Sequence, residues 1–320
     1  MSCELMKIDA VITAGDGKAA RRLFKRNKAL LDVAGKPIIR HIVEVVLKCE
    51  DIGRIVVVGP REEFLEVIGD LDVDIVQQKR SLAENGWEGF LRTIPECRQG
   101  EYCSEETIQK YRDKYVLFLS GDIPLISVRE IKQFLSQCDM ERYDYVAGAT
   151  SEEVLKLFGP RKGRPGIKMA TFHMRDGNLR QNNLHMARPF ALRESIDLVL
   201  NAYEYRYQKE FVNIIKAIFA IVKFGRKNLA QALLIYLLLQ LSAGFESLGM
   251  ERIARLVSFP VTKERVERLV SSLLNTRFKI AETTVGGAAL DVDNEKDYMT
   301  LSIMYKDWMN QITQDDHHLA

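Results

Sequence analysis

The sequence predicts a three-layer α/β/α fold around a mostly parallel β-sheet, with a helical insertion in its second half. Short apolar runs alternate with segments of helical periodicity through about the first seventy residues, and a β-α-β-α-β order implies parallel strands joined by right-handed crossovers. The apolar runs are continuous, which indicates strands buried on both faces. Beyond residue 191 the pattern changes to long, very apolar helical segments.

The first half of the chain supplies most of the predicted sheet. Ile38, Ile42 and Val45 have helical spacing, and Pro37 suits the first turn of their helix because that position needs no N–H. Gly59-Pro60 ends the second apolar run. The predicted elements are strand 10–14, helix 37–49, strand 54–58, helix 62–68, strand 73–76, a helix through 87–90, strand 115–119 and helix 127–138.

The second half combines the end of the sheet with the insertion. Asp176-Gly177 between two alternating segments predicts a hairpin. The further predicted elements are strand 143–148, apolar helices 211–222 and 229–240 joined by a glycine turn, helix 262–274, strand 278–284, and a last helix that Asp293 caps and that runs through Trp308.

Length and composition permit a large core and exclude several classes of protein. The 320 residues are 47% hydrophobic and carry a net charge of +2, which is ordinary for a globular protein and lacks the positive field typical of nucleic-acid binding. No predicted helix spans a membrane and no signal peptide is recognised, so we expect a cytoplasmic protein. Its five cysteines should be reduced, although Cys97 and Cys103 lie close enough in sequence to pair.

The first strand is followed by a glycine-rich turn and a basic segment, a combination typical of phosphate-binding sites. The apolar run ends at Gly15-Asp16-Gly17, where only a sharp turn fits well. Backbone N–H groups freed by two glycines, beside concentrated positive charge, favour a phosphate. The basic residues that follow are Lys18, Arg21, Arg22, Lys25, Arg26 and Lys28.

A second candidate position follows the strand 115–119. Asp122 stands in Ser120-Gly121-Asp122 at the carboxyl end of this strand, where open α/β sheets bind ligands. The alternative is that Asp122 only caps the next helix, but Ser127 fills that role more naturally. Asp122 is therefore interpreted as a candidate ligand-binding residue rather than as a helix cap.

With these motifs the sequence resembles nucleotidyltransferases of the glycosyltransferase-A-like fold, which is Rossmann-like, and in particular the group similar to molybdenum-cofactor guanylyltransferases. The resemblance covers about residues 1–190 and 258–310. The motifs of that group are Leu-Ala-Ala-Gly-x-Gly-x-Arg, Pro-Lys-x-Leu, Gly-Lys-Pro, Gly-Asp-x-Pro and a closing Asp-x-Asp-Thr-Pro-Glu-Asp-Leu/Tyr. The matching residues are Ala14, Gly15, Gly17, Lys28, Leu30, Gly35-Lys36-Pro37, Gly121-Asp122, Pro124, Asp291, Asp293, Glu295 (shifted by one position) and Asp297. The motif arginine falls on Ala19, and Asn27 replaces the proline before the lysine.

The resemblance implies a Mg²⁺-dependent enzyme that moves an NMP from an NTP to a phosphorylated small molecule and releases pyrophosphate. It implies catalytic roles for Lys28 and Asp122 and metal binding by Asp122 and Asp293. The implied nucleotide-binding residues are Ala14, Gly15, Asp16, Gly17, Lys18, Lys28, Gln78, Ser81, Asn85 and Gly121. The implied acceptor-binding residues are Arg164, Asn182 and Asn183, and Lys18, Arg21 or Arg22 would replace the motif arginine.

The resemblance also divides the chain and narrows the substrates. Residues 1–190 and 258–310 would form the transferase domain, 191–257 a helical insertion and 311–320 a tail. CTP and GTP are the favoured nucleotides. Sugar phosphates, polyol phosphates and a molybdopterin-type cofactor all fit as acceptor, and the apolar insertion favours a sugar or lipid-headgroup phosphate.

Several alternatives remain open at this point. Gly15-x-Gly17-x-x-Ala20 also fits an NAD(P)-binding oxidoreductase, although Gly59-Pro60 stands where the acid that binds the ribose is expected. A non-catalytic nucleotide-binding regulator is a third possibility. Gln78, Ser81 and Asn85 suit a surface loop and a helix N-cap equally well, and Arg161 to Arg164 suit a solvated loop. The insertion could pack on the sheet, form a homodimer or contact a membrane surface.

Overall fold

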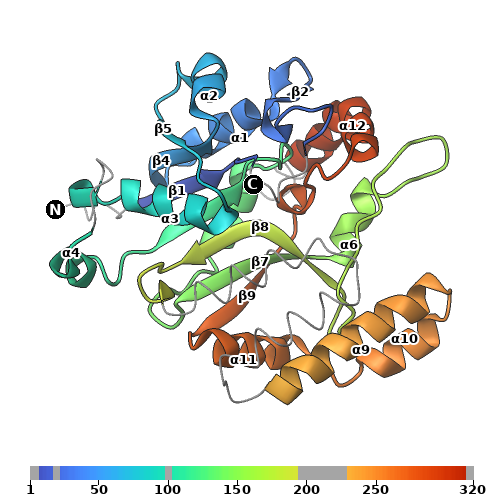
Figure 1. The fold of residues 1–320 in the computed structure, drawn as a ribbon. Coiled ribbons are helices and arrows are strands. Elements are labelled where there is room, and N and C mark those ends of the chain that lie inside the picture. The colour runs from blue at the N-terminus through green and yellow to red at the C-terminus, as the bar shows by residue number, and fades with distance from the viewer. Residues whose placement is uncertain (1–6, 17–21, 98–102, 194–228, 315–320) are drawn as a thin grey trace.

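A computed structural model describes residues 7–16, 22–97, 103–193 and 229–314, and it confirms the predicted fold class (Figure 1). A seven-stranded sheet has the order β5-β4-β1-β6-β8-β7-β9. Only β8 runs antiparallel to its neighbours, and the other pairs are parallel. The strands are β1 (Ile8–Thr13), β4 (Ile52–Gly59), β5 (Asp74–Gln77), β6 (Val116–Ser120), β7 (Tyr145–Ser151), β8 (Leu179–Ala187) and β9 (Phe278–Thr283), with a separate hairpin of β2 (Asp32–Val33) and β3 (Lys36–Pro37).

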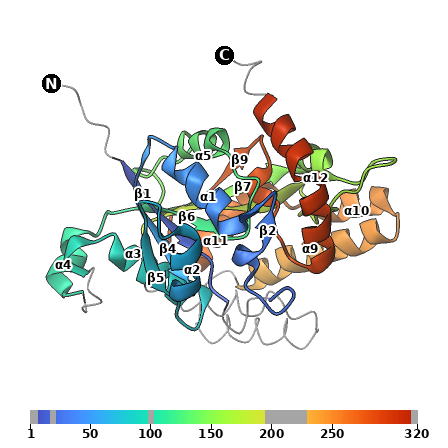
Figure 2. The same ribbon diagram turned by 90° about the horizontal axis from the view of Figure 1, so that it is seen from above.

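Helices cover both faces of the sheet, as the two ribbon views show (Figures 1 and 2). Successive residues of β1 point to opposite faces: Ala10 and Ile12 belong to a core cluster with α1, α2, α5 and α12, and Val11 belongs to a cluster with α3. The described helices are α1 (Ile38–Leu47), α2 (Arg61–Ile68), α3 (Leu82–Arg92), α4 (Glu105–Lys110), α5 (Val128–Leu135), α6 (Glu152–Leu155), α9 (Leu229–Ser247), α10 (Glu251–Ser258), α11 (Lys263–Leu274) and α12 (Glu295–Gln314), with short 3₁₀ helices η1 (Lys28–Leu30), η2 (Pro95–Cys97), η3 (Lys156–Phe158) and η5 (Gly287–Ala289).

The second predicted apolar helix of the insertion lies within α9. Ile235 is buried in a core cluster with Ala149 of β7 and Leu269 of α11, so this part of the insertion packs on the sheet and on α11. α9 lies beside α10 (Figure 1), and the hydroxyl of Ser242 donates to Ala254 O at 2.9 Å across the pair. The first predicted helix, 211–222, lies outside the described residues. Among the described helices, none has the length and hydrophobicity needed to cross a membrane.

Two expectations need correction. Cys97 and Cys103 form a disulfide, so the expectation that all five thiols are reduced is wrong. Cys49 and Cys138 are free. The turn at Asp176-Gly177 exists, but the only bridge that flanks it among the described residues joins Phe172 and Leu179. β8 instead pairs with β6 along one edge and with β7 along the other, so neither edge is free for a longer hairpin ladder.

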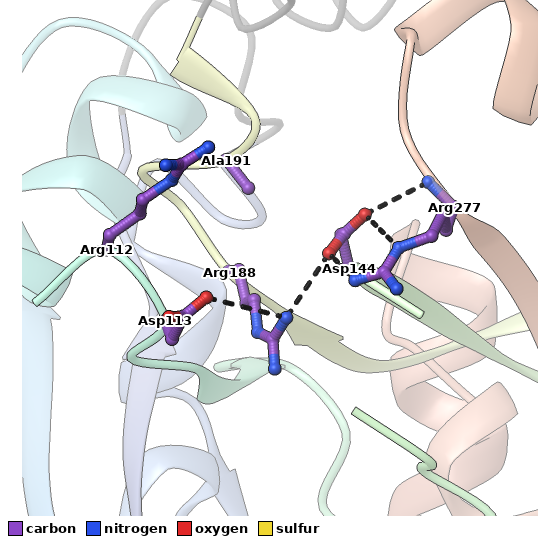
Figure 3. A pocket seen from close by; sticks show the side chains of 6 residues that line it. All are labelled: Arg112, Asp113, Asp144, Arg188, Ala191 and Arg277. Atoms are coloured by element: carbon purple, nitrogen blue, oxygen red, sulfur yellow. Dashed lines mark hydrogen bonds and ion pairs between the residues drawn. The ribbon is translucent and has the colours of Figure 1, made fainter. Parts of the chain in front are cut away.

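An arginine-rich pocket lies at the edge of the sheet where β7 and β9 begin (Figure 3). It has a volume of about 380 Å³, and its lining residues are Arg112, Asp113, Asp144, Arg188, Ala191 and Arg277. Arg277 donates to both carboxylate oxygens of Asp144, at 2.9 and 2.6 Å. Arg188 lies 3.4 Å from the same carboxylate. These charged contacts join the ends of β7, β8 and β9, so we interpret the pocket as a structural ion-pair cluster.

Asp144→Asn should lower the free energy of unfolding by about 2 kcal/mol at pH 7, because it weakens charged hydrogen bonds. The hydrogen bond from Arg277 holds the pKa of Asp144 below its usual value. The stabilisation is therefore fully present above the unfolded-state pKa of about 4 and is lost as the pH falls through the lower folded-state pKa. Urea unfolding from pH 7 to pH 3 should show the difference between variant and wild type shrinking.

The matched control is Asp139→Asn, since Asp139 is 46% exposed and lies 4.0 Å from Arg142. Its effect should stay below about 1 kcal/mol. Equal effects of the two substitutions, or a constant difference down to pH 3, would contradict the assignment.

Candidate functional site

Three charged side chains from distant parts of the sequence meet at the carboxyl ends of β1 and β6. Lys28 Nζ in η1 lies 3.7 Å from Asp122 Oδ2 and 3.4 Å from Asp293 Oδ1. Asp122 follows β6, and Asp293 precedes α12. The lysine side chain is only 13% exposed, so its ammonium group is held largely away from solvent between two carboxylates.

Asn27 fixes the position of Lys28. Its buried side chain donates to Ala14 O at the end of β1 and accepts the N–H of Ala29, both at 2.8 Å. It therefore caps η1 and joins that turn to the strand before the glycine turn. The family motif has a proline at this position, which has no side-chain amide. Asn27 therefore adds two hydrogen bonds that the proline could not make.

Asp122 is held by the turn after β6. Ser120 Oγ donates to Asp122 Oδ1 at 2.5 Å, and Val292 N donates to Asp122 O at 3.1 Å. A Cβ on Gly121 would lie 2.3 Å from the Cβ of Ala14, so only glycine lets the two turns approach this closely. The contact explains why Gly121 and Ala14 lie side by side at the site.

The two carboxylates of the acidic segment Asp291–Asp293 contact different basic residues. Asp291 Oδ1 accepts from Arg180 Nη2 at 2.8 Å, whereas Asp293 faces Lys28. Asn294 Oδ1 accepts the N–H of Asp297 at 2.9 Å, so Asn294 caps α12. The expectation that Asp293 performs this capping is wrong, and its carboxylate is left to face the site.

The site carries more negative than positive charge, which fits a divalent cation. Burial and the nearby charge of Asp291 raise the pKa of Asp122, while Lys28 opposes the shift. Three carboxylates, those of Asp122, Asp291 and Asp293, are opposed by Lys28 and Arg180. In the described part of the chain no group of three or more acidic, histidine or cysteine side chains is arranged to hold a metal alone. Two carboxylates, with substrate phosphate and water completing the shell, suit Mg²⁺.

The described part of the glycine turn connects to the segment after β5. The N–H of Asp16 donates to Gln78 Oε1 at 2.7 Å, and the Gln78 amide donates back to the Asp16 carboxylate. That carboxylate also pairs with Arg22 at 2.5 Å, so Arg22 neutralises Asp16. Gly17, Lys18, Ala19 and Arg21 lie outside the described residues.

Asn85 and Ser81 differ in their surroundings. Asn85 is 3% exposed, and its Oδ1 accepts the N–H of Lys79 at 2.6 Å. A Cβ on Gly15 would lie 2.4 Å from Asn85 Nδ2, so Asn85 packs directly against the glycine turn. Ser81 is the N-cap of α3 and forms a capping box with Glu84, which is the structural role that the sequence left open.

The three expected acceptor residues do not lie together in one cluster of contacts. Asn183 Nδ2 donates to Ala288 O at 2.9 Å. Asn182 is 2% exposed and is hydrogen-bonded to Thr150 and Thr283 inside the protein. Arg164 lies in an exposed loop, 3.7 Å from Asp307 of α12.

Sequence reasoning missed Ser120 and Arg180, which hold the two acidic segments. Ser120 directly precedes the Gly-Asp pair of the family motif, and this position could have marked it as a candidate in the sequence. Arg180 lies 111 positions before Asp291, and no local pattern marks such a pair.

Comparison with known proteins decides the family. Residues 10–204 match the MobA-like NTP transferase domain. The chain belongs to this family. It is a nucleotidyltransferase that uses an NTP, and its fold is glycosyltransferase-A-like. The family match argues against the NAD(P)-binding oxidoreductase.

The curated relatives of this NTP transferase align with only part of its chain and with only part of their own. It is 32% identical to the bifunctional protein GlmU of Francisella philomiragia over 119 residues, or 37% of this chain and 23% of that protein. It is 35% identical to GlmU of Syntrophomonas wolfei over 133 residues, which is 41% of this chain and 26% of that protein. The chain thus spans about a quarter of the length of these curated relatives. A hypothetical transferase from Thermus thermophilus shares the fold, with a TM-score of 0.58 and 20% identity over 91% of this chain and 99% of that one.

Asn27→Ala should lower the free energy of unfolding of the transferase by about 2–3 kcal/mol, since it leaves buried groups of Ala14 and Ala29 without partners. Urea unfolding measures this change. Asn178→Ala is the control, because Asn178 Nδ2 bonds the Glu152 side chain away from the site, and it should cost less. The assigned role of Asn27 is wrong if the two variants are equally stable.

Proposed function

We propose that the enzyme transfers an NMP from an NTP to a phosphorylated small molecule, releases pyrophosphate and requires Mg²⁺. The observation that carries this proposal is the convergence of Lys28, Asp122 and Asp293 beside the glycine turn. A cation and two carboxylates at the end of a phosphate-binding turn suit charge stabilisation of a triphosphate.

Asp122 and Asp293 are the residues that would hold Mg²⁺. The raised pKa of Asp122, caused first by burial and then by Asp291, supports a site that favours added positive charge. When bound, the ion would supply neutralisation for the phosphate oxygens. Ser120 and the backbone of Val292 keep Asp122 oriented toward Lys28.

The reaction needs no protein nucleophile. A phosphate oxygen of the acceptor forms a bond to the α-phosphorus, and the bond from that phosphorus to the oxygen bridging to the β-phosphate breaks. Pyrophosphate leaves with the electron pair of that bond. Lys28 stabilises the negative charge that develops, and the turn at Ala14, Gly15 and Asp16, continued by Gly17 and Lys18, binds the phosphates.

The nucleoside would lie against Gln78 and Asn85. Both side chains contact the glycine turn, which supports their role in holding the base or ribose. Ser81 would act through the start of α3, and Gly121 would give the nucleotide close access to the backbone. CTP or GTP is the proposed donor.

The acceptor is proposed to be a sugar or polyol phosphate, or a lipid-headgroup phosphate. Arg164 in its exposed basic loop suits the acceptor phosphate, and Asn183 suits a hydroxyl group. The burial of Asn182 speaks against direct contact with the acceptor, and we leave it out. The two-part transferase domain, a homodimer through the insertion and a cytoplasmic location stay predictions.

Lys28→Ala should reduce NTP-dependent pyrophosphate release by about 10²–10³-fold, the usual effect of removing one group that stabilises developing charge. The assay supplies each NTP with Mg²⁺ and a panel of sugar and polyol phosphates. Lys156→Ala is the control, since Lys156 is 63% exposed and pairs only with Glu153 among the described residues. Equal rates for Lys28→Ala and the control would contradict the proposed mechanism.

Removal of divalent metal with EDTA should abolish pyrophosphate release, and added Mg²⁺ should restore it. Asp293→Asn should raise the half-saturating Mg²⁺ concentration at least about tenfold, because it removes a ligand charge. Asp74→Asn serves as the control, because Asp74 is half exposed and pairs with Arg54 at the far edge of the sheet. Full activity in EDTA would refute the metal requirement.

A further inference from the structure

Glu130 of α5 is a fully buried carboxylate with no part in the proposed reaction. Its Oε1 accepts the N–H of Gly286 at 3.1 Å and the hydroxyl of Thr283 at 2.9 Å, and its Oε2 accepts the N–H of Ala288 at 2.8 Å. Each of these partners is a donor, so two oxygens that only accept match the site. Burial raises the pKa of Glu130, and the bonds from Ala288, Thr283 and Gly286 oppose the shift.

These bonds hold the turn that follows β9. Gly286 has a φ of +88°, which favours glycine. A Cβ on Gly287 would lie 2.0 Å from Leu125 O, so the turn packs directly on the loop that carries Asp122. A buried charge joined to backbone groups fixes such a turn strongly, because loss of one partner leaves a buried polar group unsatisfied.

The turn continues into the acidic segment through further contacts. Asn183 donates to Ala288 O at 2.9 Å, and Arg180 Nε donates to Ala289 O at 3.1 Å. Arg180 also bonds the Asp291 side chain. The N–H of Val292 then donates to Asp122 O. Both backbone polar groups of Ala288, its N–H and its C=O, are therefore hydrogen-bonded, and Asp293 lies five residues further along.

We propose that Glu130 is a positioning residue that places Asp293 opposite Asp122 and so sets the affinity of the site for its divalent ion. The proposal rests on the proposed function, because it assumes that these two carboxylates share a metal. Glu130 acts through the backbone of the η5 turn and touches neither substrate nor metal. Groups that orient metal ligands typically change metal affinity 10–100-fold when they are altered.

The chain offers a matched control in Glu267 of α11. It is 7% exposed, accepts the N–H of Ile280 in β9 at 3.0 Å and bonds Lys279 at 3.1 Å. Glu267 thus joins a helix to the same strand through a carboxylate, but neither of these hydrogen bonds involves the η5 turn. A general loss of stability should affect both variants, whereas metal affinity should change only with Glu130.

The test is Glu130→Gln against Glu267→Gln. Glutamine keeps the size of the side chain but has one acceptor and one NH₂ group, so with Oε1 kept at Thr283 and Gly286 the NH₂ would face the Ala288 N–H. Mn²⁺ binding is measured by electron paramagnetic resonance on the full chain, with and without NTP, below the unfolding temperature of both variants. The half-saturating Mg²⁺ concentration for pyrophosphate release is measured in parallel.

Glu130→Gln should raise the Mn²⁺ dissociation constant and the half-saturating Mg²⁺ concentration about tenfold, with Glu267→Gln unchanged. Equal metal affinity in Glu130→Gln and wild type, or equal losses in both variants, overturns the positioning role while leaving the proposed function intact. A wild-type chain without metal-dependent turnover instead overturns the proposed function. If Glu130→Gln does not fold, Asn183→Ala removes the hydrogen bond to the C=O of Ala288, the residue whose N–H bonds Glu130, and unchanged Mn²⁺ affinity in that variant overturns the proposal.

Discussion

The structure around the site depends on the ammonium group of Lys28, which lies between the carboxylates of Asp122 and Asp293. Like charges brought together out of solvent repel one another, and the cost is large unless a cation or hydrogen bonds compensate it. Lys28 and Arg180 compensate only part of three acidic charges. The remaining negative charge supports the proposed binding of a divalent ion, and the position of Lys28 beside Asn27 and Ala14 suits the phosphates of the proposed NTP.

Backbone contacts keep these charges in place. Asn27 joins η1 to the end of β1, Gly121 lets the turn after β6 pack against Ala14, and Val292 bonds Asp122 O. The parallel strands β1 and β6 bring their carboxyl ends to one edge of the sheet, which is where open α/β sheets bind ligands. The sheet thus brings the segments of the site together, and hydrogen bonds and close backbone packing orient the charged side chains within it.

Much of this arrangement follows from local sequence patterns. Continuous apolar runs predicted the strands β1, β4 and β6 and the fold class, because strands buried on both faces are apolar along their length. Contacts over long sequence separations left no such pattern. The pairing of Arg180 with Asp291 and the bond of Glu130 to Ala288 each depend on tertiary packing. The cap of α12 is local, but both Asp293 and Asn294 are residue types that cap helices, and the sequence pattern did not distinguish them. The disulfide between Cys97 and Cys103 joins residues only six positions apart, and the sequence marked this pair as a possible one without deciding its redox state.

The central claim is that Lys28, Asp122 and Asp293 serve one divalent ion and one triphosphate. A crystal of the full chain with Mn²⁺ and an NTP analogue that cannot be cleaved between its α- and β-phosphates tests it most directly, because the anomalous signal of manganese locates the ion independently of the refined coordinates. The account predicts a manganese peak in contact with Asp122 and Asp293, with the phosphates beside Lys28 and the turn at Gly15. A peak elsewhere, or a triphosphate bound away from Lys28, would contradict it.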